Sequence, residues 1–112
     1  MIRFCKNVKQ DTITKPLISQ LVRSGTSIGA NYMEANAASS RKDFKNKIHI
    51  CKKGAQETKH WLRMISLCAL EQKDETRELW KECQELTLIF GKIVSSLKNS
   101  ALIQNSKLEI QN

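Results

Sequence analysis

Apolar residues recur every three or four positions along most of the chain, and the most regular run lies in its middle. Between residues 42 and 70 the steps from one apolar-seam position to the next are 4, 3, 4, 3, 4, 3 and 4. This heptad spacing predicts one long helix with a continuous packing seam, as in helical bundles and coiled coils. The seam comprises Phe44, Ile48, Cys51, Ala55, Thr58, Leu62, Ile65 and Ala69.

The same periodicity predicts two further long helices and one short one. Pro16 is a favourable first-turn residue for a helix that runs to about residue 37. The last helix runs from about residue 75 to residue 98, with apolar positions at steps of 4, 3, 4, 3 and 4. Residues 1–10 predict a short helix. Ser40, followed by Asp43, predicts an N-cap for the middle helix, and Asp74 predicts one for the last helix.

These elements predict an all-α helical bundle of three long helices, or four helices when residues 1–10 are counted. Four glycines and one proline allow few tight turns, and no alternating apolar run reaches the length of a strand. We expect a single domain over residues 1–98. Residues 99–112 have weak apolar content and no capping residue, so we expect a frayed or disordered tail there.

Residues 24–44, SGTSIGANYMEANAASSRKDF, contain Gly25 and Gly29 among other small residues. A phosphate-binding loop would need a preceding strand and a Lys followed by Ser or Thr at the start of the helix. No strand precedes Gly25, and Gly29 is followed by Ala30 and Asn31. Small residues four apart on one helical face instead allow a neighbouring backbone to approach closely. We therefore predict that Gly25 and Gly29 are helix-packing positions.

Charge is the strongest signal in the composition, with 19 Lys and Arg against 11 Asp and Glu, a net charge of +8. On the middle helix, basic residues spaced 4, 7, 7 and 4 fall on one face and form a stripe about 33 Å long. The stripe consists of Arg41, Lys45, Lys52, Lys59 and Arg63. Residues 71–85 contain six acidic and three basic residues, so the charge distribution is uneven.

Two interpretations of this basic stripe stay open. Its long side chains can simply cover the edge of the core while their charges remain in water. Alternatively, the stripe follows the phosphates of RNA or DNA, or meets the acidic helix of another copy. Aromatic residues are few, so nucleic-acid binding would be directed at the backbone and weakly sequence-specific.

Catalytic and metal-binding patterns are weak. Glu57 and His60 form one E-x-x-H, whereas a dinuclear bundle site needs a second E-x-x-H and two further glutamates. His49 and His60 are the only histidines, and neither shares a helical face with a nucleophile and an orienting carboxylate. We therefore expect no enzyme activity, metal or cofactor.

The four cysteines lack C-x-x-C spacing, and the chain has no signal peptide and no apolar run of about 18 residues. We expect a cytoplasmic protein with no membrane association.

The segment QLVRSGTSIGANYMEANAASSRKDF, followed by CKKGAQETKHWL, resembles the signature of a family of small bacterial proteins. These are the four-helix-bundle proteins named for the intervening sequences of 23S rRNA. The resemblance covers roughly residues 16–98. The matching positions are Arg23, Ser27, Ile28, Asn31, Glu34, Ser40, Phe44, Glu57 and Leu62.

This resemblance implies an up-and-down four-helix bundle that forms a homo-oligomer, typically a pentamer, and has no enzymatic activity. It also implies likeness to the accessory variability protein of diversity-generating retroelements, a basic pentamer that engages a reverse transcriptase and nucleic acid. Family members begin with a full first helix and usually have proline near position 29. A chain that offers about ten residues before its connector is therefore expected to have a short or truncated first helix.

We expect Arg23, Asn31, Glu34 and Glu57 to form a polar network inside or between subunits, with Arg23 as the shared counter-charge. The predicted function is that of a non-enzymatic, basic, oligomeric protein that binds RNA or DNA phosphates or assists a ribonucleoprotein. The alternative is a protein-interaction adaptor, for example to a reverse transcriptase, without direct contact to nucleic acid.

Overall fold

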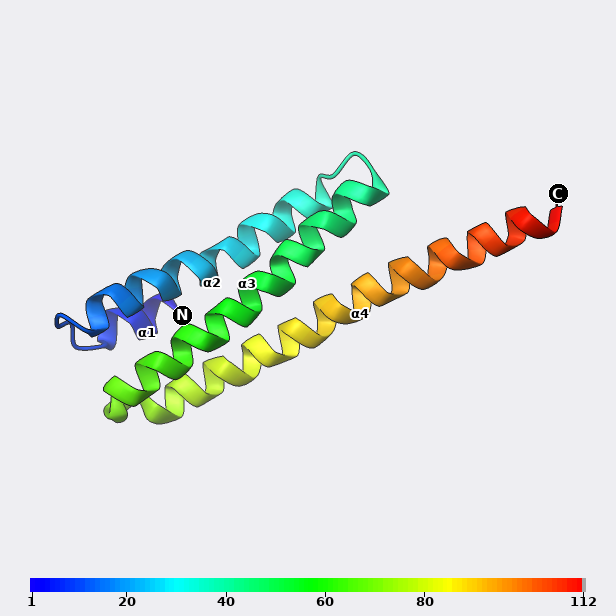
Figure 1. The fold of residues 1–112 in the computed structure, drawn as a ribbon. Helices are drawn as coiled ribbons and strands as arrows, with labels where there is room; N and C mark the ends of the chain where they lie inside the picture. Colours follow the sequence, from blue (N-terminus) through cyan, green and yellow to red (C-terminus); the bar gives the residue numbers. More distant parts are fainter. Residues whose placement is uncertain (112) are drawn as a thin grey trace.

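A computed structural model describes residues 1–111 of the chain, and side chains over residues 1–99. Its elements are α1 (Ile2–Asn7), α2 (Thr14–Asn36), α3 (Arg41–Cys68), a 3₁₀ turn η1 (Leu70–Gln72) and α4 (Lys73–Gln111). The long helices α2, α3 and α4 run antiparallel side by side, and α1 lies against the beginning of α2 (Figure 1). The prediction of an all-α, up-and-down four-helix bundle with a short first helix is confirmed.

Helix α3 lies between the other two long helices and contacts both along its length, whereas α2 and α4 make few direct contacts. The predicted heptad seam of α3 faces these two neighbours. Its end members, Phe44 and Ala69, are half-buried. Its six inner members have no exposed surface: Ile48, Cys51, Ala55, Thr58, Leu62 and Ile65. The burial of this seam confirms the heptad prediction.

The core consists of two clusters, one towards each end of the bundle. The first brings Phe4, Cys5 and Val8 of the N-terminal segment against Leu62 and Cys83, together with side chains of α2. The second contains Ala35, Ile48, Cys51, Phe90 and Val94, from α2, α3 and α4 alone. Helix α1 therefore contributes only to the first cluster.

A side-chain cap marks the beginning of α3. Ser40 accepts a hydrogen bond from the backbone N–H of Asp43 (3.1 Å), which confirms the predicted N-cap of α3. The prediction that Asp74 caps α4 is wrong. The 3₁₀ turn η1 continues directly into α4 at Lys73, so Asp74 lies within the first turn of that helix.

The polar connector before α2 is organised by Asp11. Its carboxylate accepts hydrogen bonds from the backbone N–H groups of Ile13 and Thr14, both at 2.8 Å. The hydroxyl of Thr14 donates to the carbonyl of Lys9 at 2.7 Å. The N–H groups of Thr14 and Ile13 lower the pKa of Asp11, because they stabilise its ionised form. This arrangement turns the chain from α1 into α2.

Helix α4 is longer than predicted. It continues to Gln111 and extends past the connection between α2 and α3 (Figure 1). The expected frayed or disordered tail over residues 99–112 is therefore helical up to residue 111, and residue 112 lies outside the described residues. Within the described chain, no helix combines the length and the apolar content that crossing a bilayer requires.

The glycines differ from one another in what surrounds them. A Cβ on Gly54 of α3 would lie 3.2 Å from Ile28 Cγ1 and from Ser27 Oγ, so Gly54 is the site where α2 and α3 approach closely. A Cβ on Gly25 would lie 2.9 Å from the sulfur of Met1, whereas one on Gly29 would meet nothing within 4 Å. The prediction that Gly29 is a helix-packing position is wrong for this protomer, and Gly25 packs against Met1 instead of a long helix.

The different surroundings of Gly54 and Gly29 predict that larger side chains at these two positions have opposite effects on stability. Gly54→Leu should destabilise the fold by about 1–3 kcal/mol, because the larger side chain forces α2 and α3 apart. Gly29→Ala should stabilise it by about 0.5–1 kcal/mol, because an exposed helical glycine gains helix propensity without a clash. Guanidinium unfolding of both variants measures the two changes. Equal effects at the two positions would contradict the packing described for α2 and α3.

The four free cysteines predict selective chemical modification. Burial raises the pKa of Cys5, Cys51 and Cys83, so little thiolate forms at these positions, whereas Cys68 is exposed. At about pH 8, Ellman's reagent should therefore react rapidly with a single thiol of the native protein, and Cys68→Ser should abolish that phase. All four thiols should react in guanidinium. Rapid reaction of a second thiol in the native Cys68→Ser variant would contradict the burial of the core cysteines.

Candidate nucleic-acid interface

The predicted basic stripe of α3 lies along the outer edge of the contact between α3 and α4. Lys45, Lys52 and Lys59 are half-buried, and Arg41 and Arg63 are exposed. The half-burial arises because their aliphatic stems cover the edge of the helix pair.

Two of the lysines make specific contacts with α4. The ammonium of Lys59 donates a hydrogen bond to Gln84 Oε1 and lies 5.4 Å from the ring centroid of Trp80. A Cβ atom added to Gly91 would lie 3.7 Å from both Cε and Nζ of Lys52. The end of the Lys52 side chain therefore packs over Gly91 of α4. These contacts position the stripe against α4.

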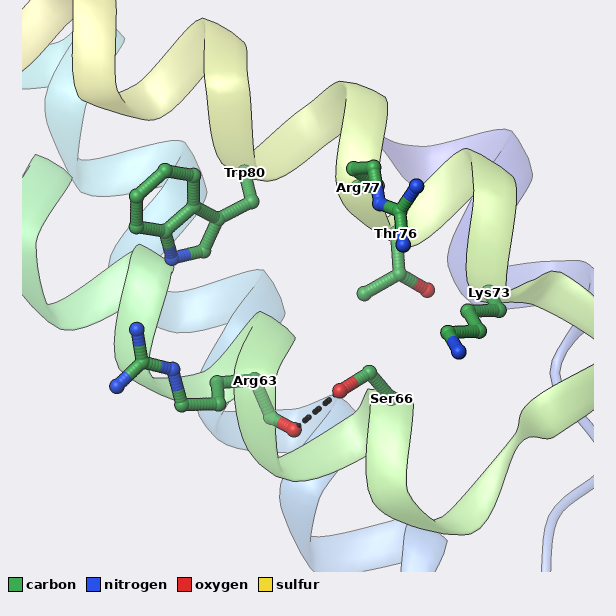
Figure 2. A pocket seen from close by; sticks show the side chains of 6 residues that line it. All are labelled: Arg63, Ser66, Lys73, Thr76, Arg77 and Trp80. Carbon is green, nitrogen blue, oxygen red and sulfur yellow. Dashed lines mark hydrogen bonds between the residues drawn. The ribbon is translucent and has the colours of Figure 1, made fainter.

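Helix α4 adds basic residues to this surface that lie outside the predicted stripe of α3. Lys73 and Arg77 lie at the beginning of α4, and together with Arg63 and Ser66 of α3 they line a hollow of about 300 Å³. Thr76 and Trp80 complete the lining (Figure 2). We call the surface formed by Lys52, Lys59, Arg63, Lys73, Arg77 and Trp80 the α3/α4 basic groove.

Figure 2 shows the indole of Trp80 beside the guanidinium of Arg63 at one end of the hollow. Lys73 lies at the opposite end, and Thr76 and Arg77 lie between the two ends on α4. A second hollow adjoins the first, since Arg63 and Trp80 also line it together with Gln56, Lys59 and His60. Trp80 thus stands between two adjacent hollows of one basic groove.

Among side chains 1–99, no salt bridge neutralises a cation of the groove. The two salt bridges found among side chains 1–99 are Arg23–Glu57 and Lys47–Glu34, and neither involves a groove residue. No acidic side chain is part of the lining of either hollow. Several cations that share one surface without counter-charges create a positive potential that attracts anions.

The acidic residues of α4 lie on another face of the same helix. At 100° per residue, Lys73, Arg77 and Trp80 share one face, at steps of 4 and 3. The acidic residues follow steps of 3, 4 and 3 on the opposite side, and all are exposed: Glu75, Glu78, Glu82 and Glu85. The net acidity of residues 71–85 therefore concealed a basic face, which a separate count for each helical face would have found.

Arg41, at the beginning of α3, lines a third hollow together with Lys92 of α4. The apolar part of its lining comes from Ile89, Ile93 and Leu97. This hollow contains neither Lys52 nor Lys59. We therefore place Arg41 at the far end of the stripe and leave it out of the α3/α4 basic groove.

Within one protomer, the predicted polar network does not form as a single unit. Arg23 pairs with Glu57 at 3.0 Å, with 59% and 36% of the two side chains exposed. Glu34 pairs with Lys47 instead of Arg23, and the side-chain amide of Asn31 donates to the carbonyl of Ser27 in its own helix. Within one protomer, Arg23 is therefore the counter-charge of Glu57 and not of Glu34.

The buried polar contact between α2 and α3 involves different residues. The hydroxyls of Ser24 and Thr58, neither of which is exposed, are hydrogen-bonded to each other at 3.0 Å beside Gly54. Thr58 also hydrogen-bonds to the carbonyl of Gly54 at 2.7 Å. Small hydroxyl side chains at this point satisfy each other and still let the two helices approach.

The E-x-x-H of α3 lies on its outer surface. Glu57 is paired with Arg23, and the ring of His60 lies edge-on to Trp61 with the centroids 4.8 Å apart. Over the residues that the structure describes, no group of three or more His, Cys, Asp or Glu side chains gathers in a way that suits a metal ion.

Comparisons with known proteins agree with the resemblance seen in the sequence. The model of the 23S rRNA-intervening sequence protein family matches residues 1–92. A solved structure of a protein of unknown function from the S23 ribosomal protein family of Bacteroides thetaiotaomicron is similar, with 36% identity and a TM-score of 0.66. The similarity covers 70% of this chain and 72% of that one. A comparison with curated proteins gives no match. The chain belongs to the family of 23S rRNA-intervening sequence proteins.

Proposed function

We propose that this protein is a non-enzymatic, self-associating helical-bundle protein of the cytoplasm that binds RNA or DNA through the α3/α4 basic groove. Its role would be that of a ribonucleoprotein accessory. The observation that carries the proposal is the set of cations from two helices that share one groove with no acidic side chain in the lining of its two hollows. Phosphate backbones are the polyanions that such a surface attracts most strongly.

Contacts of this kind are directed at phosphates and therefore carry little sequence information. Lysine and arginine heads on flexible stems adapt to the backbone of many sequences. We therefore expect affinity that depends steeply on salt and weakly on base sequence. Exposed acidic residues on the opposite face of α4 would limit binding to one side of the molecule.

Exposed apolar side chains support self-association and also a second candidate function as a protein-interaction adaptor. Leu67 and Leu70 are about 70% exposed at the end of the bundle where α3 meets α4. Leu88 and Ile89 are more than half exposed on α4. Exposed apolar surface of this kind marks protein–protein contacts. The homo-oligomer, which the family resemblance gives as a pentamer, and an adaptor partner would both use such surfaces.

Charge reversal at the groove tests the proposed function. Lys52→Glu combined with Arg63→Glu should weaken binding of an oligonucleotide of about 20 nucleotides by about tenfold or more, because repulsion replaces two phosphate contacts. It should also make the plot of log affinity against log salt less steep, by about 1.4–1.8 in slope. Fluorescence anisotropy over about 50–200 mM salt measures both quantities.

Lys9→Glu combined with Lys15→Glu is the matched control, since both lysines are exposed and neither lines a hollow of the groove. Each double variant reverses two cations and so lowers the net charge by four, from +8 to +4. The control should retain most of the affinity. Equal losses in the two variants would mean that net charge alone causes binding. Absence of binding by the parent protein, together with a stoichiometric partner that survives nuclease treatment in a pull-down, would favour the adaptor.

A further inference from the structure

The first hollow of the groove contains more than positive charge. The Trp80 indole forms one end of it, and the buried Thr76 contributes a methyl group to its lining (Figure 2). Trp80 lines both hollows, whereas Lys59, whose ammonium lies 5.4 Å from the Trp80 ring centroid, lines the second hollow and not the first. The hollow therefore combines an aromatic surface with a surrounding set of cations.

This combination matches the two parts of a nucleotide. A base stacks on an aromatic side chain irrespective of its sequence, while arginine and lysine bind the phosphate attached to it. A hollow of about 300 Å³ is at the lower end of the range of sites that hold small molecules. In a duplex the bases are stacked on one another, so a base can reach Trp80 only from a single strand or from a free nucleotide.

We propose that the hollow beside Trp80 holds one unpaired nucleotide of a single strand, with its base stacked on the indole and its phosphates bound by Arg63, Lys73 and Arg77. This inference rests on the proposed function and specifies its substrate as single-stranded nucleic acid. The remaining groove lysines, Lys59 and Lys52, continue the positive surface along α3 and contact the neighbouring phosphates.

The location of the cations supports this assignment. Arg63 lies beside the indole, and Lys73 lies at the opposite end of the hollow (Figure 2). Phosphates flanking a stacked base lie on either side of it along the strand, so cations at both ends of the hollow suit a strand that passes through it. None of these three cations has an ion-pair partner among side chains 1–99.

Trp80→Leu tests the assignment, because it keeps an apolar side chain against the core and removes the aromatic surface. It should lower the affinity for a single-stranded oligonucleotide about 5- to 100-fold, whereas Trp80→Phe should retain most of it. Affinity for a duplex of the same length should change less than about twofold, since the duplex contacts only the cations. Tyr32→Leu, on the exposed surface of α2, is the matched control and should change neither affinity.

Fluorine NMR of the protein without substitutions, labelled with 5-fluorotryptophan, provides a second measurement. The chain has two tryptophans, and Trp80→Phe assigns their resonances. The single strand should shift the Trp80 resonance and leave that of Trp61 in place. Adenosine monophosphate should produce the same shift at far higher concentration, since it lacks the neighbouring phosphates.

The possible outcomes separate this inference from the proposed function. A single strand that binds without moving the Trp80 resonance would overturn the inference and leave groove binding intact. Adenosine monophosphate that binds as tightly as the oligonucleotide would assign the hollow to a free nucleotide and overturn the single-strand assignment. Absence of binding by single strand, duplex and mononucleotide would overturn both proposals.

Discussion

The packing of one seam of α3 against two neighbours is the interaction on which the bundle depends. All six inner seam residues are fully buried, and they connect both core clusters. Because α2 and α4 make few direct contacts, each is held mainly through α3. The close approach at Gly54, with the Ser24–Thr58 hydrogen bond beside it, determines how α2 lies on α3.

This arrangement also determines where charge can be placed. With its inner face packed against α2 and α4, α3 has the basic stripe from Arg41 to Arg63 at the outer edge of the α4 contact. Helix α4 meets that edge with Lys73, Arg77 and Trp80 and presents its glutamates on another face. A groove built in this way needs neither a loop nor a mobile element, because two helices that share a core hold its residues in place.

The helices and the buried seam could be predicted because a heptad of apolar residues has one stable solution, burial along a single stripe. Which residues of α2 and α3 contact each other could not be predicted from the same pattern. The spacing of Gly25 and Gly29 indicated a close contact, but which glycine lies at a helix crossing depends on the packing angle, and Gly54 occupies that place. Similarly, Glu34 and Glu57 lie on α2 and α3 at positions whose nearest cations are Lys47 and Arg23, respectively.

The candidate site could be predicted for α3 and not for α4. The stripe from Arg41 to Arg63 follows from periodicity within one helix. Trp80 and its neighbours join it only because α4 packs against that edge, which is a tertiary contact between residues far apart in the sequence. The chain does have few aromatic residues, and residues 71–85 do have a net negative charge. Neither number says on which face of α4 the aromatic and charged residues lie.

Lysine footprinting tests the central claim, that nucleic acid occupies the α3/α4 basic groove, most directly. The protein would be acetylated with a water-soluble reagent in the presence and absence of a single-stranded oligonucleotide, and modification would be quantified by mass spectrometry. Lys52, Lys59 and Lys73 should be protected, whereas Lys9 and Lys15 should react equally in both samples. Protection of Lys9 and Lys15 with unchanged reactivity at Lys59 and Lys73 would contradict the account.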